Sequence, residues 1–109
     1  MSPLASSLPT DGVTFLLTDI EGSTRAWQAA PEAMTAPVAR HYEILDSAIA
    51  VHGGMRPQEQ GEGDSIVAVF RTAADAVGAA LAAQLALCRE LPDLPVRMAL
   101  HSGDAMLRN

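Results

Sequence analysis

The chain has 109 residues, of which 49% are hydrophobic and 18% are charged, enough for one globular domain with its own core. Its formal net charge of −6 disfavours a general affinity for nucleic acid or for anionic membrane surfaces. The single cysteine, Cys88, excludes an intrachain disulfide and a thiolate zinc cluster, and no apolar run is long enough to span a bilayer. These features predict a cytoplasmic protein that binds neither nucleic acid nor membrane.

The first elements follow a short leader. Residues 1–12 are rich in Ser, Pro and Gly and predict a flexible segment, so the folded domain is expected at 13–109. The run VTFLLTDI, Val13 to Ile20, is apolar and contains β-branched residues, which is typical of a buried strand. A turn should follow, with Ser23 or Thr24 capping a short helix.

A long helix is expected to begin near Pro37, because proline suits a first helical position. One face of this helix is marked by residues at spacings of three and four, namely Val38, His41, Tyr42, Leu45, Ala48, Ile49 and His52. The Gly53–Gly54 pair is a strong stop signal. Residues 55–60 are ambiguous, and Pro57 would restrict them to an edge strand. A turn through residues 61–64 would then lead into a clear strand at 65–70.

The second long helix should begin after Thr72, which stands three residues before Asp75 as in a capping box. The face expected to pack on a sheet consists of Val77, Ala80, Leu81, Gln84, Leu85 and Cys88, with Cys88 as a small core residue. Two prolines end the helix, and a last strand is expected at 96–100, with an extension past Ser102 left open.

The element order is therefore β–α–β–β–α–β. This order predicts an α+β fold of the ferredoxin-like type, a two-layer sandwich of an antiparallel sheet with both helices on one face. The first and third strands should lie side by side at the centre of the sheet. Their adjacency would bring Asp19, at the end of the first strand, close to Asp64, in the turn before the third.

Two carboxylates at neighbouring strand ends form a hard-oxygen site suited to Mg²⁺ or Mn²⁺. Such ions share their coordination shell with water and substrate phosphates, so the pattern predicts a nucleotide site. The alternative is that Asp19 starts an Asx-type turn and Asp64 is a hairpin turn residue.

Three motifs carry a specific resemblance. FLLTDIEGSTRAW, GEGDSIVAVF and VRMALHSGDA, in this order, resemble the class III nucleotidyl cyclases, the adenylate and guanylate cyclase family, and most of all its bacterial cytosolic members. The likeness extends from Val13 to Leu107 and corresponds to the N-terminal part of the catalytic domain. It implies that Asp19 and Asp64 are the two metal-binding aspartates and that Ile20 contributes its carbonyl.

The resemblance also implies a substrate and a reaction. Glu21, Gly22, Ser23 and Thr24 fall where the family wraps the nucleotide phosphates with backbone N–H groups. The reaction implied is attack of the ribose 3′-oxygen on the α-phosphate of ATP, giving 3′,5′-cyclic AMP and pyrophosphate with Mg²⁺ or Mn²⁺. Gln60 stands where many adenylate cyclases have an adenine-contacting lysine, and because its amide both donates and accepts, the base could be that of ATP or GTP.

A second departure concerns the rest of the site. In the family, an adenine-reading Asp or Asn, a ribose-orienting Asn and a transition-state Arg lie downstream of the last predicted strand, and the chain ends at Asn109 before any of them. The family works as an antiparallel dimer that shares these groups across subunits. A homodimer, or a heterodimer with another cyclase-type subunit, is therefore expected, and the chain alone should show little turnover.

Other functions compete with this hypothesis. The principal alternative is a degenerate cyclase-like module that dimerises and regulates a partner without catalysis. A diguanylate cyclase would need a GG-[DE]-EF hairpin where this chain reads GEGDS, and a receiver domain would need alternating parallel strands. Structural functions are expected for a further set of polar residues, namely His41, His52, His101, Ser102 and Asp104.

Overall fold

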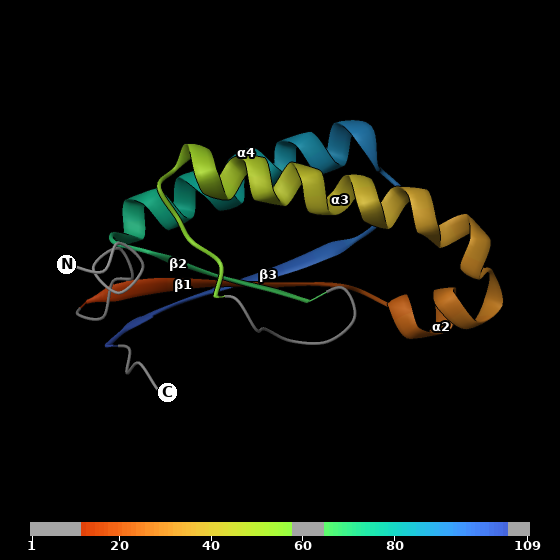
Figure 1. Cartoon of the computed structure of the whole chain (residues 1–109), viewed down its shortest axis with the longest axis horizontal. Helices are drawn as coiled ribbons and strands as arrows, with labels where there is room; N and C mark the ends of the chain where they lie inside the picture. The colour runs from red at the N-terminus through yellow and green to blue at the C-terminus, as the bar shows by residue number, and fades with distance from the viewer. Residues whose placement is uncertain (1–11, 58–64, 105–109) are drawn as a thin grey trace.

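The computed structural model describes residues 12–57 and 65–104. In chain order its elements are β1 (Val13–Ile20), α2 (Ser23–Ala29), α3 (Pro31–Val51), β2 (Ile66–Phe70), α4 (Ala73–Glu90) and β3 (Val96–Gly103). The two long helices α3 and α4 lie side by side on one face of the sheet, and α2 lies beyond the end of β1 (Figure 1). The predicted α+β fold class, an antiparallel sheet with helices on one face, is confirmed.

The sheet is organised around β1. Its strand order is β2–β1–β3, and β1 pairs antiparallel with both neighbours. The predicted adjacency of the first strand and the strand that ends at Phe70 is therefore confirmed. In β3 the ladder is longer than the sequence predicted, because pairing continues from Ile20 opposite Val96 to Val13 opposite Gly103.

The ambiguous stretch after α3 contributes one bridge to the sheet. Met55 pairs antiparallel with Val69 of β2, and the two backbones exchange hydrogen bonds of 2.9 and 2.7 Å. Pro57 follows closely and has no backbone N–H to donate, in line with the predicted edge position. Residues 58–64, including Gln60 and Asp64, lie outside the described part of the chain.

Helix α3 begins earlier than predicted. Pro31 occupies the start, and Pro37 lies inside the helix instead of opening it. The prediction placed the start at the wrong proline, because both residues satisfy the preference for a first-turn position. One turn further along, the hydroxyl of Thr35 donates to the carbonyl of Pro31 at 3.1 Å. The stop at Gly53 is confirmed, with a left-handed φ of 73° that a glycine adopts without strain.

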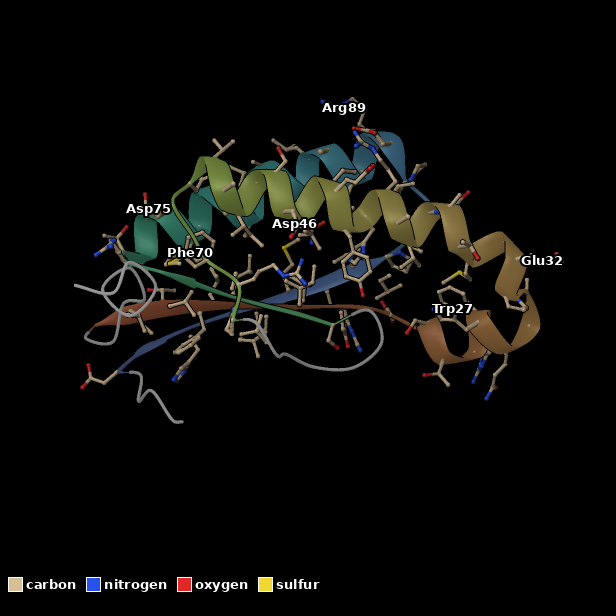
Figure 2. The ribbon with its side chains drawn as sticks, viewed as in Figure 1. Trp27, Glu32, Asp46, Phe70, Asp75 and Arg89 are labelled. Atoms are coloured by element: carbon tan, nitrogen blue, oxygen red, sulfur yellow. The ribbon has the colours of Figure 1, made fainter. Side chains whose placement is uncertain are left out.

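The main core lies between the sheet and the two long helices. It is built by Leu16 of β1, by Ile66, Ala68 and Phe70 of β2, and by buried residues of α3 and α4. Phe70 is fully buried, and Figure 2 shows its ring on the helix side of β2. A smaller cluster of Ile20, Met34 and Val38 is partly covered by Trp27, which fastens α2 to the end of the sheet.

Helix α4 faces the core with its smallest residues. The buried positions are Ala76, Ala79, Ala83 and Leu87, whereas Val77, Leu81 and Leu85 are 50%, 60% and 60% exposed. The predicted face, which also included Cys88 as a core residue, is therefore wrong, and Cys88 is exposed. Helix formation itself is confirmed, with the Thr72 hydroxyl accepting from the Asp75 N–H at 3.0 Å.

The buried face of α4 was predicted wrongly because the helix is apolar on almost every side. Between Ala76 and Cys88 no residue is charged, and the one polar side chain, Gln84, donates to the Val96 carbonyl at 3.0 Å. Two stripes therefore satisfy the helical period equally well. The alanine stripe allows the helix backbone to come closer to its neighbours, and close approach decides the orientation.

The long helices also contact each other. His52, at the end of α3, lies against Gly78 of α4, where a Cβ would come within 2.8 Å of the imidazole Cδ2. At the other end Arg40 forms a two-pronged ion pair with Glu90, with distances of 2.8 and 3.1 Å. Within residues 12–57 and 65–104, no helix has the length and apolar character to cross a membrane.

The orientation of α4 can be tested by a matched pair of substitutions. We expect Leu87→Ala to lower the free energy of unfolding by about 2–4 kcal/mol, because it leaves a cavity in the core. Leu85→Ala should change it by less than about 1 kcal/mol, because that side chain is already largely in water. Urea unfolding measures both, and a larger loss for Leu85→Ala than for Leu87→Ala would contradict the observed orientation of α4.

Candidate functional site

Asp19 lies near the carboxyl end of β1, directly opposite Arg97 of β3. The guanidinium donates from Nε to Oδ1 at 2.9 Å and from Nη2 to Oδ2 at 2.7 Å. Both carboxylate oxygens are therefore engaged by one planar fork, a geometry that lysine cannot reproduce. The two side chains remain 40% and 62% exposed, so water screens the pair.

Arg97 also sets the charge state of the aspartate. Its hydrogen bonds hold the pKa of the Asp19 carboxyl below the usual range, and its positive charge acts in the same direction. Partial desolvation opposes the shift but is outweighed by the hydrogen bonds. Asp19 is therefore an anion throughout the physiological range, as a ligand for a hard cation must be.

The pair borders a pocket of about 310 Å³. Residues from the ends of all three strands line it, among them Leu17, Asp19, Ser65, Val67, Arg97 and Ala99. Side chains alternate along β1, and Leu16 and Ile20 belong to the core, so Leu17 and Asp19 point to the face opposite α3 and α4. The pocket is thus lined mostly by apolar side chains of the sheet, and the charged pair of Asp19 and Arg97 forms its rim at one end.

The loop after β1 differs from the prediction in its capping. Gly22 is the N-cap of α2 with a left-handed φ of 72°, and no side chain caps the helix. The expectation that Ser23 or Thr24 would do so is wrong, because both already lie within the first turn. The Glu21 N–H donates to the Pro95 carbonyl at 2.8 Å, which joins the loop to the segment before β3.

Of the remaining predicted site residues, Ile20 is placed and two are not. The Ile20 side chain is 3% exposed and belongs to the smaller cluster, so any contribution to a site would come from its backbone. Gln60 and Asp64 lie outside the described residues. Ser65, which follows Asp64 directly in the chain, lines the same pocket as Asp19.

Metal-binding capacity is limited in the described part of the chain. Within residues 12–57 and 65–104, no three His, Cys, Asp or Glu side chains lie together as a ready metal cluster. The oxygens of Asp19 are nevertheless the kind of ligand that Mg²⁺ prefers, and this ion often takes only one or two carboxylates and completes its shell with water and phosphates. The donor chemistry of the rim fits such an ion.

Of the other polar residues singled out by sequence, four form hydrogen bonds within the fold. His41 is fully buried in α3, with Nδ1 at 3.3 Å from the Val38 carbonyl, and His52 places its Nδ1 at 2.9 Å from the Ala48 carbonyl. The Ser102 and Thr14 hydroxyls share a hydrogen bond of 2.8 Å across the sheet. Asp104 accepts from the Gly12 N–H at 3.0 Å. His101 is exposed on β3, opposite Phe15.

Sequence reasoning missed Arg97. The residue is the one charged position in an otherwise apolar stretch of β3, and this contrast was the available signal. Its partner, however, follows only from the register between β1 and β3, which the sequence does not specify.

The chain is similar in sequence to several known proteins. No family model matches the chain. An uncharacterised protein of Mycobacterium tuberculosis is 42% identical over 101 residues, covering 93% of this chain and 34% of the relative. A receptor-type adenylate cyclase of Trypanosoma congolense is 41% identical over 78 residues, covering 72% of this chain and 10% of the relative. An adenylate cyclase of Lachancea kluyveri is 34% identical over 79 residues, which are 72% of this chain and 4% of that protein.

Solved structures agree with these relatives. A Trypanosoma brucei adenylate cyclase, described in its monomeric state, superposes with a TM-score of 0.80 at 25% identity, over 92% of this chain and 60% of that one. The chain is an adenylate cyclase-like domain. A bacterial light-regulated adenylyl cyclase shares the fold, with a TM-score of 0.74 at 20% identity. The resemblance to class III cyclases is thereby confirmed, and the cyclase-like domain spans about a third or less of the curated relatives described above.

The ion pair generates a pH-dependent prediction. We expect Asp19→Asn to lower the free energy of unfolding slightly at pH 7, because the pair it breaks is exposed. The pKa of Asp19 is lower in the folded chain than in the unfolded chain, where it is near 4. The ion pair therefore stabilises the fold above the unfolded pKa, and this stabilisation is lost as pH falls through the folded pKa. The difference from wild type should shrink below about pH 4.

Urea unfolding with EDTA present, at pH 7 and at about pH 3, measures this difference. The matched control is Asp93→Asn, an exposed aspartate in the turn before β3. A wild-type-to-variant difference for Asp19 that stays constant over this range would contradict the assignment.

The loop conformation gives a separate prediction. Gly22→Ala should destabilise the domain by about 1 kcal/mol, because an alanine in the left-handed region is strained. Apart from its chain neighbours, no described atom lies within 4 Å of the position where its Cβ would stand, so the effect comes from the backbone conformation. Gly22→Asn is the matched variant and should lose less, since asparagine adopts this region more readily. Urea unfolding compares them, and a larger loss for Asn would refute the backbone explanation.

Proposed function

We propose that the cyclase-like domain supplies the metal-binding and phosphate-binding half of a nucleotidyl cyclase site. The reaction would convert ATP to 3′,5′-cyclic AMP and pyrophosphate, with Gln60 leaving GTP as a second substrate to be tested. The observation that carries the proposal is the position of Asp19, an ionised carboxylate at the end of the central strand, on the rim of a pocket and shortly before the Gly22 turn.

Asp19 and Asp64, with the carbonyl of Ile20, are the proposed ligands of Mg²⁺ or Mn²⁺. When bound, the ion would offset the negative charge of the triphosphate and acidify the attacking hydroxyl. Asp64 is included for two reasons. It belongs to the GEGDS motif, and it directly precedes Ser65, which lines the pocket.

The proposed phosphate contacts come from the loop. The first N–H groups of a helix have no acceptor within the helix, which leaves those at Ser23 and Thr24 for phosphate oxygens. The Glu21 N–H is already bound to Pro95, so its contribution would be to hold the loop against β3. Gly22 would allow the backbone to turn sharply beside the nucleotide.

The other half of the site is proposed to come from a second cyclase-type subunit, in a homodimer or a heterodimer. In the family, the groups that read the base, orient the ribose and stabilise the transition state are Asn and Arg side chains contributed by the second subunit. A cytoplasmic location would give such a subunit access to ATP.

Nucleotide binding tests the proposal directly. Calorimetric titration of the purified chain with ATP should show binding that requires Mn²⁺ and weakens at least about tenfold in Asp19→Asn. Asp93→Asn, an exposed aspartate of the turn before β3, serves as the matched control and should bind as wild type. A folded chain that binds no ATP with Mn²⁺ would refute the proposal.

Product formation tests the division of the site. Cyclic AMP should be scarce with the chain alone and should rise when a cyclase subunit is added that carries the downstream Asn and Arg but lacks its own metal aspartates. Dimerisation without nucleotide binding would instead favour a non-catalytic regulatory module.

A further inference from the structure

Asp19 and Arg97 are held together by the sheet itself. They are direct partners in the antiparallel register, and both line the pocket opposite the helices. Side chains at such positions start about 5 Å apart, so the arginine reaches the carboxylate without distorting either strand. The pair is therefore a consequence of register and needs no loop to form.

The geometry leaves the carboxylate poorly suited to a second cation. Both oxygens accept from the guanidinium, at 2.9 and 2.7 Å. A divalent ion bound to either oxygen would stand a few ångströms from a permanent positive charge, where like charges repel. Ion and guanidinium thus compete for one carboxylate.

The pair is also weak enough to be displaced. Arg97 is 62% exposed and Asp19 40%, so solvent takes up much of their interaction. A divalent cation carries twice the charge of the guanidinium and binds the oxygens directly, which favours exchange when the ion is abundant.

We propose that Arg97 is a positioning residue that holds Asp19 in the metal-free domain and is displaced when a divalent cation binds. This inference rests on the proposed function, in which Asp19 is a metal ligand. Its consequence is that Arg97 lowers the affinity for the ion, so that the site fills only at higher ion concentration or when a nucleotide brings the ion with it.

Mn²⁺ binding to the full chain, followed by electron paramagnetic resonance of the free ion, tests this without any activity measurement. Arg97→Gln should bind Mn²⁺ roughly two- to fivefold more tightly than wild type, the range expected for loss of an exposed ion pair. Arg97→Lys keeps the charge but loses the fork and should lie between them. Arg25→Gln removes an exposed charge on α2 and controls for net charge.

A second measurement follows the arginine. The Nε–H proton signal of Arg97 should shift when Mg²⁺ is added to wild type and should not respond to Mg²⁺ in Asp19→Asn. Circular dichroism confirms that each variant is folded before either measurement.

The outcomes separate the two proposals. If wild type binds Mn²⁺ through Asp19 and Arg97→Gln binds equally or less tightly, the inference fails and the proposed site stands. If Arg25→Gln tightens Mn²⁺ binding as much as Arg97→Gln, the effect comes from net charge, and the proposed competition for the Asp19 carboxylate is refuted. If Asp19→Asn binds Mn²⁺ as tightly as wild type, both the proposed metal site and this inference fail.

Discussion

The central strand β1 is the constraint on which the rest of the domain depends. Both of its edges are hydrogen bonded, its inward side chains enter both hydrophobic clusters, and its final residues lead into the loop before α2. An apolar strand fixed on two sides has little freedom. Its last acidic side chain, Asp19, is therefore presented at a position defined by the sheet and not by a mobile loop.

The same register explains why the rim of the pocket holds opposite charges. Asp19 is 40% exposed on the face opposite the helices, and its neighbour across the strands is Arg97. The chain thereby keeps an ionised carboxylate in reach of solvent without leaving it unpaired. In the metal site proposed above, Arg97 would hold this carboxylate until an ion displaces it.

Much of this arrangement could be predicted from sequence, and the failures have identifiable causes. Runs such as Val13–Ile20 predicted their strands well, because apolar β-branched character and a following Gly leave few alternatives. The outward face of α4 was predicted wrongly because alanine and leucine stripes fit the period equally, and only packing distance separates them. Pro31 and Pro37 were equivalent as helix starts. The pairing of Asp19 with Arg97 depends on a register over 78 residues of separation, which no local pattern contains.

The position of β1 in the chain has a consequence for how the domain is made on the ribosome. Strand β3, which pairs with β1 along its whole length, ends at Gly103, 83 residues after Ile20. The ladder between β1 and β3 therefore cannot be completed until Gly103 has emerged from the ribosome. At ordinary rates of synthesis this takes roughly 4 to 17 s. During that time one edge of the apolar strand β1 is unpaired, and an unpaired apolar edge favours aggregation. Until β3 has emerged, this edge of β1 is available for pairing with another chain.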